Sequence, residues 1–416
     1  MSLRRTVPAG LLDAACASLA TFAVGLYAAR SLPPAALGVY ALFFAAFVMA
    51  AIVPTQLLFT PAEIASLSSG GVARLRLLAH SLPLGMLPAL LAALLASGAA
   101  VLATAGASIS LIAPLAVTTA VCTFLSPVQD HVRRMLHFAG RSWRAAAVSV
   151  VQLMVCVVGL LLAPRLSIPG AWVPFGVLAL ANAVSLSAGL LFSAEGRAHP
   201  ALDRPSLRGM LRSGTWFVVL RLLPGVANFV SGALVSRLAG AAALGYVEAA
   251  RVAGQPLLVL ATGLSGVLGP RLMESGTDRR LDRARSLSRL FQLLVLACGV
   301  PYIAWIGVPW ILNPMPKILP NAYVVWGLLP LMAIAQLVEG LLPAYRAQLM
   351  GADRGKTLVS LEGPACALQC LVAATAGATG AFAKPLGMLA QSTLGFGLLR
   401  WARDRLYLEP VTAKDR

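Results

Sequence analysis

The sequence is poor in charged side chains. Asp, Glu, Lys and Arg make up 12% of its 416 residues, and only 15 residues are acidic. Apolar residues make up 59%, and the mean hydropathy is +0.82. A soluble domain has no need of so apolar a composition, because its exterior is polar. The shortage of charge therefore excludes a soluble globular protein and indicates an all-α polytopic membrane protein.

Several chemical signatures are also missing. No G-x-x-x-x-G-K-[ST] stretch is present, so the chain is not expected to hydrolyse ATP itself. The six cysteines all lie inside apolar runs, where a thiol packs as a small hydrophobe, and their spacing fits neither a metal site nor a secreted disulfide framework. The sequence therefore indicates no cofactor and no bound metal.

The apolar residues fall into windows of about 20, the length that crosses roughly 30 Å of hydrocarbon. These windows predict twelve transmembrane helices. They lie near residues 8–29, 36–58, 77–97, 108–129, 145–163, 170–192, 215–236, 243–268, 288–308, 321–343, 358–379 and 385–401.

The basic residues predict the orientation. With the N-terminus in the cytoplasm, 26 of the 33 Lys and Arg residues fall on the cytoplasmic side of this topology, Arg133 and Arg403 among them, and five on the opposite side. The positive-inside rule then places both termini in the cytoplasm, as expected for a bacterial inner-membrane protein. The net charge of +18 resides in loops that face an anionic leaflet, so it does not indicate a nucleic-acid partner.

Two short passages occur twice. "RSLPPAALGVY" from Arg30 matches "RLAGAAALGYV" from Arg237, so Arg30 and Gly38 align with Arg237 and Gly245 at an offset of 207. "RRMLHFAGRSW" and "RAQLMGADRGK" align at an offset of 213. These matches predict a tandem duplication of a six-helix unit. Because six is even, the copies are expected to be parallel repeats, in bundles 1–196 and 215–416 joined by a cytoplasmic linker, 197–214.

Three stretches resemble a known family: "GLYAARSLPPAALGVYALFFAAF", "SRLAGAAALGYVEAARVAGQPLLVL" and "AGRSWRAAAVSVVQ". They are similar to the polysaccharide branch of the multidrug/oligosaccharidyl-lipid/polysaccharide exporter (MOP) superfamily, the O-antigen-type flippases. The resemblance implies a V-shaped, MATE-like pair of six-helix bundles that works by alternating access. It also implies a role in surface polysaccharide biosynthesis, in which an oligosaccharide on undecaprenyl diphosphate moves from the inner to the outer leaflet. The partners implied are this lipid-linked oligosaccharide, membrane lipids, and polysaccharide polymerase or chain-length proteins.

Ionisable side chains within spans are candidate site residues, because each costs about 2.5–3.5 kcal/mol on insertion scales unless a partner or water meets it. Arg221 and Asn228 share one helix face and are candidates for binding an anionic cargo. The candidate binding residues are Arg221, Asn228, Arg251 and Asp13, and the candidate ion-coupling residues are Asp13, Glu248 and Glu339. A structural Glu248–Arg251 pair and an Arg221 that reaches the headgroups are the alternatives.

Three other functions remain open from the residues alone. A drug exporter of the same superfamily is one, although organic cations would favour a more acidic cavity. A membrane enzyme of polysaccharide assembly is another, although the outer loops are short and the longest, "PWILNPMPKILPNA", has no carboxylate or histidine. A non-transporting subunit of a secretion complex is the third. The sequence does not identify the sugar.

Overall fold

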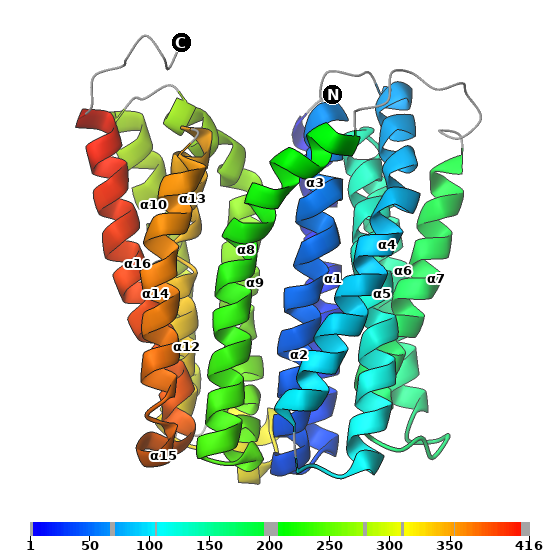
Figure 1. Cartoon of the computed structure of the whole chain (residues 1–416), viewed down its shortest axis with the longest axis vertical. Coiled ribbons are helices and arrows are strands. Elements are labelled where there is room, and N and C mark those ends of the chain that lie inside the picture. Colours follow the sequence, from blue (N-terminus) through cyan, green and yellow to red (C-terminus); the bar gives the residue numbers. More distant parts are fainter. Residues whose placement is uncertain are drawn as a thin grey trace. The chain divides into compact units, whose positions relative to one another are not determined.

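The structure is a computed structural model that describes residues 3–66, 71–104, 106–194, 207–277, 281–308, 312–352 and 354–408. Within these ranges all regular secondary structure is helical, which confirms the predicted fold class (Figure 1). The first helices are α1 (Leu3–Ser31), α2 (Pro34–Pro54), η1 (Thr55–Phe59), α3 (Thr60–Ala65), α4 (Gly71–Ala103), α5 (Ile109–Phe138), α6 (Ser142–Leu162), α7 (Val173–Phe192) and α8 (Leu207–Leu238). The others are α9 (Ala241–Thr277), α10 (Leu281–Gly307), α11 (Met315–Ile318), η4 (Asn321–Tyr323), α12 (Leu328–Glu339), α13 (Pro343–Gly351), α14 (Gly355–Ala373), α15 (Ala376–Thr379), η5 (Gly380–Phe382) and α16 (Ala383–Leu408).

The chain packs into two compact units. Unit 1 consists of Met1–Ser236 and Gly240–Glu248, so it includes α8 except its last two residues, and the start of α9. Unit 2 consists of Arg237–Ala239 and Ala249–Arg416. The predicted repeat boundaries at residues 196 and 215 stay a prediction, and residues 197–206 of the predicted linker lie outside the described ranges.

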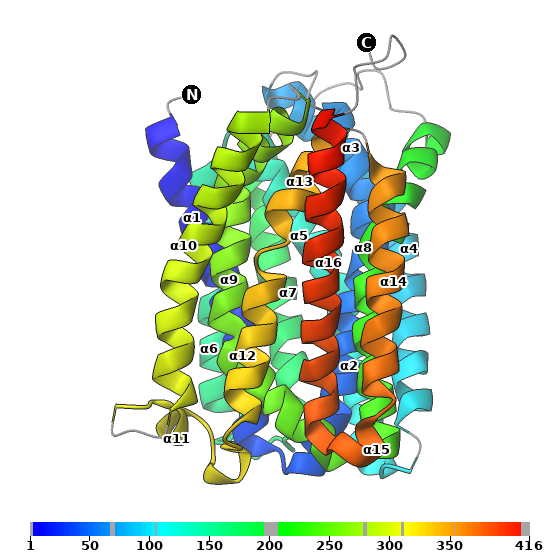
Figure 2. The same ribbon diagram turned by 90° about the vertical axis from the view of Figure 1, so that its left-hand side faces the viewer.

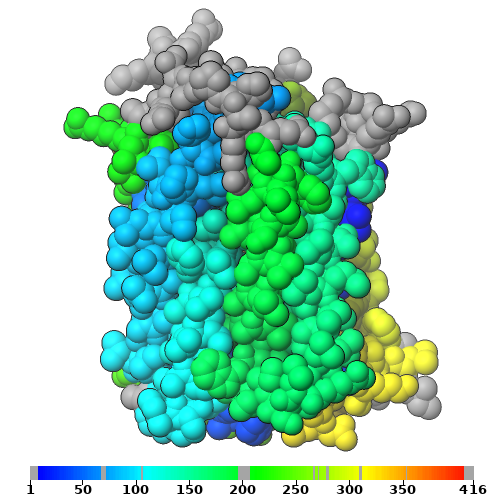
Figure 3. Space-filling model, turned by 90° about the vertical axis from the view of Figure 1, so that its right-hand side faces the viewer, coloured from blue at the N-terminus to red at the C-terminus, as the bar shows by residue number. Residues whose placement is uncertain are grey.

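The helices identify a multi-pass membrane protein. In the described ranges nine helical segments are long and apolar enough to cross a membrane, and the pair α14 and α16, bent by 51°, adds a tenth. All twelve predicted windows overlap these helices or neighbouring ones, but the count of twelve spans stays a prediction. α4 lies on the face of the molecule that Figure 3 shows. Leu87, Leu95 and Leu102 of α4 are 63%, 74% and 74% exposed. Such side chains suit contact with lipid tails.

In unit 1 a π-helical turn positions part of the site. α2 continues through η1 into α3, and Pro54 and Pro61 flank this turn. Neither proline has an N–H to complete the α-helical ladder, which favours a local change of helix type. As a result Phe59 is buried and stacks on His131 of α5, with ring centroids 4.1 Å apart.

Unit 2 contains a broken span. α12 ends at Glu339, and α13 begins three residues after Gly340 with Pro343, a residue well suited to the first helical position because it needs no N–H bond there. Both short helices pack against α16, which also packs against α14 (Figure 2). The predicted coupling residue Glu339 is therefore the last residue of α12, directly before the break.

The two repeated glycines meet within unit 1. A Cβ on Gly38 of α2 would overlap the backbone of Ala241, and a Cβ on Gly245 of α9 would overlap the backbone of Pro34. These contacts are reciprocal, because Pro34 and Ala241 are also 207 positions apart. A local twofold axis between equivalent segments produces this reciprocity. Gly38 and Gly245 therefore allow the backbones of α2 and α9 to pack directly.

Candidate functional site

A network of charged and polar side chains lies inside unit 1, where α5 ends. Asp130, Arg133, Arg134 and His137 follow the spacing i, i+3, i+4, i+7, so one face of α5 carries them. We call the full set the Asp13 network. Its members are Asp13 of α1, Glu63 of α3, Ser81 of α4, Asp130, His131, Arg133, Arg134 and His137 of α5, and Ser149 of α6.

Asp13 accepts hydrogen bonds from two neighbouring helices. Its Oδ1 accepts from Ser149 Oγ at 2.5 Å and from Arg133 Nη1 at 3.3 Å, and its Oδ2 lies 2.9 Å from His137 Nε2. The Asp13 residue is 8% exposed and Ser149 is fully buried. A carboxylate in this position holds α1, α5 and α6 together through charge-assisted hydrogen bonds.

The network continues through Asp130 to α3 and α4. Asp130 accepts from Arg133 and, at 2.6 Å, from Arg134, whose second nitrogen lies 3.6 Å from Glu63 Oε2. Glu63 Oε1 lies 3.2 Å from Nδ1 of the buried His131. Because each carboxylate meets at least one basic group, these buried charges are compensated.

The far side of His131 completes the chain of contacts. Its Nε2 lies 2.8 Å from the hydroxyl of Ser81, which donates to the carbonyl oxygen of Leu78 at 2.7 Å. While Ser81 donates to Leu78, its hydroxyl oxygen can only accept a hydrogen bond from Nε2–H of the imidazole. A continuous polar path leads from Asp13 to Ser81 across unit 1.

The net charge of the network would allow it to take up one positive ion. With both imidazoles neutral, it contains three carboxylates and two guanidinium groups, a net charge of −1. One proton or one monovalent cation brings this sum to zero. Buried carboxylates that can be neutralised in this way are the usual elements of proton relays in membrane transporters.

The sequence placed most of these residues outside the helix. The fourth predicted span ended at residue 129 and left His131, Arg133, Arg134 and His137 in a loop. That loop was wrong, because α5 continues to Phe138, whereas the cytoplasmic side of these residues stays a prediction. A hydropathy window ends at the first cluster of charges, although partners on other helices neutralise those charges. The i, i+3, i+4, i+7 spacing was the signal that could have extended the helix.

The other predicted site residues lie elsewhere. Arg221 and Asn228 are on α8, where Arg221 is exposed and Asn228 is half-buried. Glu248 and Arg251 are on α9; Glu248 is buried, and the Arg251 carbonyl oxygen accepts from Gln336 at 3.2 Å. Of the predicted residues, the network contains Asp13, and the binding and coupling roles of all of them stay predictions.

A smaller buried pair lies in unit 2. Arg346 Nε of α13 donates to Glu362 Oε1 of α14 at 2.5 Å, and Glu362 is 4% exposed. Glu362 is thus a buried partner of an arginine. The equivalent of Arg133 at the offset of 213 is Arg346, and the equivalent of Ser149 is Glu362.

No protein-family model and no curated protein matches the sequence. Solved structures are similar. A multidrug resistance MATE family transporter of the MOP superfamily in its inward-facing conformation has a TM-score of 0.71 at 14% identity, over 95% of this chain and 96% of that one. A MOP superfamily transporter from Pyrococcus furiosus, described as having a binding pocket of reverse polarity, has a TM-score of 0.66 at 17% identity, over 97% and 95%.

A third similar structure is a multidrug resistance MATE family transporter in its outward-facing conformation. Its TM-score is 0.65 at 15% identity, over 97% of this chain and 94% of that one. The similarity covers almost the whole chain in each case, and the apolar helices agree with a membrane location. The chain therefore has the fold of the MATE transporters of the MOP superfamily, as its motifs predicted.

Proposed function

We propose that the chain is a membrane transporter that works by alternating access. The observation that carries this proposal is the fold match, which spans at least 95% of the chain and includes one transporter in an inward-facing and one in an outward-facing conformation. A chain that shares the fold over its full length has the parts needed for both conformations. We propose a bacterial inner-membrane location with both termini cytoplasmic, which a C-terminal reporter active only in the cytoplasm would test.

We propose further that the cargo is a lipid-linked oligosaccharide, moved from the inner to the outer leaflet. The motif resemblance to polysaccharide flippases supports this cargo. A diphosphate-linked sugar is an anion, and arginine binds phosphate oxygens in a bidentate manner. Polysaccharide polymerase or chain-length proteins are the partners that this role requires downstream.

Export of small molecules is the second candidate. It is favoured by the names of two of the similar structures, which are multidrug resistance transporters. The Pyrococcus furiosus protein, by contrast, is described as having a pocket of reverse polarity that suggests a different function, so the fold accommodates more than one cargo. Charge in the cargo path is the property that separates the two candidates.

The test of the cargo follows the precursor across the membrane. Cells that depend on this chain should accumulate lipid-linked oligosaccharide in the inner leaflet when the gene is deleted, and Arg221→Ala should do the same while expression stays unchanged. Inverted vesicles are tested in parallel with a radiolabelled cationic dye. Chain-dependent dye uptake without a change in the precursor would favour the drug exporter and remove the flippase proposal.

We also propose that the Asp13 network couples transport to a proton or Na⁺. Protonation of Asp13 removes the charge that Arg133 Nη1 and His137 Nε2 meet, and Arg133 then keeps Asp130 as its carboxylate partner. The contact of α5 with α1 therefore weakens when Asp13 is neutral and strengthens when it is charged. Such a charge-dependent contact between helices can bias one conformation over another.

The coupling proposal predicts a loss of transport without a loss of folding. Asp13→Asn keeps the shape of the side chain but not its charge, so precursor movement should fall at least about tenfold. Asp282→Asn, at an exposed position in the first turn of α10, is the matched control and should leave transport unchanged. Normal transport by a well-folded Asp13→Asn protein would exclude Asp13 from coupling.

A further inference from the structure

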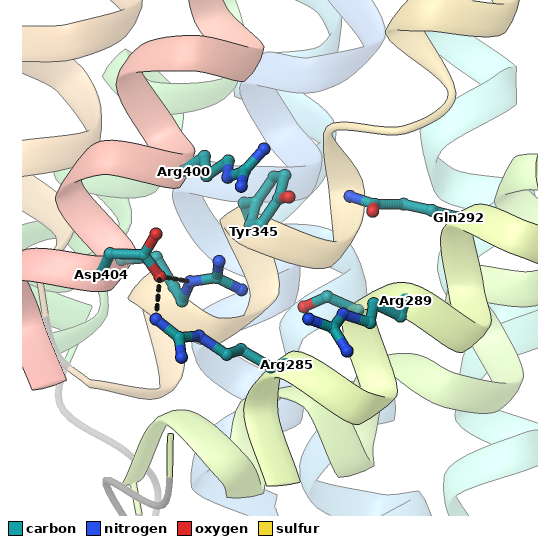
Figure 4. A pocket seen from close by; sticks show the side chains of 8 residues that line it. Arg285, Arg289, Gln292, Tyr345, Arg400 and Asp404 are labelled. Atoms are coloured by element: carbon teal, nitrogen blue, oxygen red, sulfur yellow. Dashed lines mark ion pairs between the residues drawn. The ribbon is translucent and has the colours of Figure 1, made fainter. Parts of the chain in front are cut away.

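A pocket rich in arginine lies inside unit 2, between α10, α13 and α16 (Figure 4). Its cavity measures about 200 Å³. We call it the arginine pocket; the lining side chains that matter to its chemistry are Arg285 and Arg289 of α10, Tyr345 of α13, and Arg400, Arg403 and Asp404 of α16. None of these residues belongs to the Asp13 network or to the predicted binding set.

Helix periodicity brings the arginines together. Arg285 and Arg289 are one turn apart on α10, and Arg400 and Arg403 are three positions apart on α16. Figure 4 shows the α10 pair facing the α16 side chains across the pocket. The sequence alone treated these residues as ordinary positive-inside charges near the helix ends.

The arginine pocket has a surplus of positive charge. Among its described lining residues four are arginines and one, Asp404, is acidic, so the walls carry a net charge of +3. Asp404 Oδ1 lies 2.8 Å from Arg403 Nε and 3.9 Å from Arg285 Nη2. One carboxylate cannot compensate four guanidinium groups, and like charges held together favour an anion between them.

Arg403 is held in place before any anion arrives. It is 4% exposed, and its guanidinium carbon lies 5.0 Å from the centre of the buried ring of Tyr345. The ring of Tyr345 is in turn held edge-on by Phe396, with centroids 5.3 Å apart. Arg403 Nε lies 2.8 Å from Asp404 Oδ1, whereas the buried amide nitrogen Nε2 of Gln292 in the same wall has no hydrogen-bond partner among the described residues. One buried donor of the pocket wall therefore lacks an acceptor.

The size and the position of the arginine pocket limit the kind of ligand that it can bind. Pockets for drug-sized molecules measure roughly 300–1,000 Å³, so a cavity of about 200 Å³ suits a charged group of a few atoms rather than a whole drug. The pocket lies near the end of unit 2 where α10 begins and α16 ends, which the predicted topology places at the inner leaflet. Basic pockets between transmembrane helices on that side bind lipid head groups.

We propose that the arginine pocket of unit 2 is a binding site for the phosphate or diphosphate group of a membrane lipid. Two sources have this chemistry: an anionic phospholipid of the bilayer and a polyprenyl diphosphate. The site itself does not depend on the cargo proposed above; only the second source rests on that proposed function. Binding can be measured without transport, so failure of one proposal is distinguishable from failure of the other.

The test uses the purified full-length protein in neutral detergent. Farnesyl diphosphate and inorganic diphosphate represent the diphosphate, and mixed micelles with phosphatidic acid or phosphatidylglycerol represent the bilayer lipids. Affinities are measured by calorimetry for wild type and for the double variant Arg289→Gln/Arg400→Gln. Because hydrogen bonds to charged groups are the strong ones, we expect the double variant to bind about tenfold to hundredfold more weakly.

A matched control removes the same charge from the same helices. Arg283 of α10 pairs with Glu274, and Arg405 of α16 lies over the Trp401 ring, so Arg283→Gln/Arg405→Gln lowers the net charge equally outside the pocket. This control should keep the wild-type affinity. Asp404→Asn removes the competing carboxylate and should bind the same probes several-fold more tightly, which a purely structural role would not produce.

The outcomes show whether the arginine pocket binds an anionic group and which kind of lipid supplies that group. Selective binding of farnesyl diphosphate assigns the pocket to a polyprenyl diphosphate, and equal or tighter binding of phosphatidic acid assigns it to a bilayer phospholipid. Equal weakening in the pocket and control variants would mean general attraction to a basic surface, and it would overturn the proposal. No measurable binding of any probe by the folded wild-type protein would overturn it as well.

Discussion

Arg133 of unit 1 and Arg346 of unit 2 occupy equivalent positions of the sequence repeat but have different surroundings. Each reaches a side chain 16 residues further along the chain: Arg133 contacts Ser149, and Arg346 contacts Glu362. In unit 1 the carboxylates come from α1 and from α5 itself, through Asp13 and Asp130. In unit 2 the carboxylate stands at the equivalent position of Ser149, so Arg346 contacts a carboxylate where Arg133 contacts a hydroxyl.

The two units also differ in the net charge of their charged clusters. The Asp13 network is within one charge of balance, which suits a site that gains and loses a small cation. The arginine pocket keeps a surplus of +3, which suits a site that receives an anion. Four tests, made with five substitutions, would break or sharpen this comparison, and they follow in order of decreasing effect.

Arg133→Gln should have the largest effect. It removes the bridge between Asp13 and Asp130, so Asp13 keeps only Ser149 and His137 as partners and Asp130 keeps only Arg134; the loss of these ion pairs should cost about 3–5 kcal/mol of unfolding free energy. Denaturant titration in micelles measures this change. Arg144→Gln, an exposed arginine on α6 that donates to the Phe192 carbonyl oxygen, is the control and should cost at most about 1 kcal/mol. An equal cost at both positions would mean that the network does not stabilise unit 1.

Arg346→Gln should have a smaller effect, because one carboxylate is left instead of two. The loss of a hydrogen bond between charged groups predicts a cost of about 2–3 kcal/mol. Adding Glu362→Gln should restore part of that stability, because the carboxylate that lost its arginine partner is then removed as well. If the double variant were less stable than Arg346→Gln by the full cost of a second mutation, the pair would not be coupled.

Gly38→Ala and Gly245→Ala test the contact in which the two repeats remain alike. Each added methyl overlaps the backbone of the opposite helix, so each should cost about 1–3 kcal/mol, and the two costs should be similar. Gly98→Ala on α4, where a Cβ meets no atom within 4 Å, should instead stabilise the protein by about 0.5–1 kcal/mol. Thermal unfolding of all three in one detergent would show whether the α2 and α9 backbones touch reciprocally.

Arg289→Gln should have the smallest effect on stability. The residue is exposed and lies among three other arginines, so unfolding free energy should change by no more than about 0.5 kcal/mol or should rise slightly. The substitution should instead lower the affinity of the arginine pocket for anions. A loss of several kcal/mol would show that Arg289 is a structural residue and would remove the contrast between the two units.

The helices were predictable because lipid demands long apolar segments whose backbone groups are satisfied internally. Asp13 was predictable for the same reason, since a charge inside an apolar run calls for a partner. Its partners were not predictable, because Ser149 and His137 are 136 and 124 positions away in the sequence. The π-helical turn that brings Phe59 and Glu63 to His131 also left no pattern in hydropathy.

The amino-acid sequence by itself determined that this is an all-helical membrane protein with two alike corners, because apolar run length and local repeats are properties of neighbouring residues. Tertiary structure alone decided which charges cancel and which do not. Charge compensation depends on distances of 2.5–4 Å between side chains of different helices. Arg133 therefore lies in a network within one charge of balance, whereas Arg289 and Arg400 line a pocket with a surplus of positive charge.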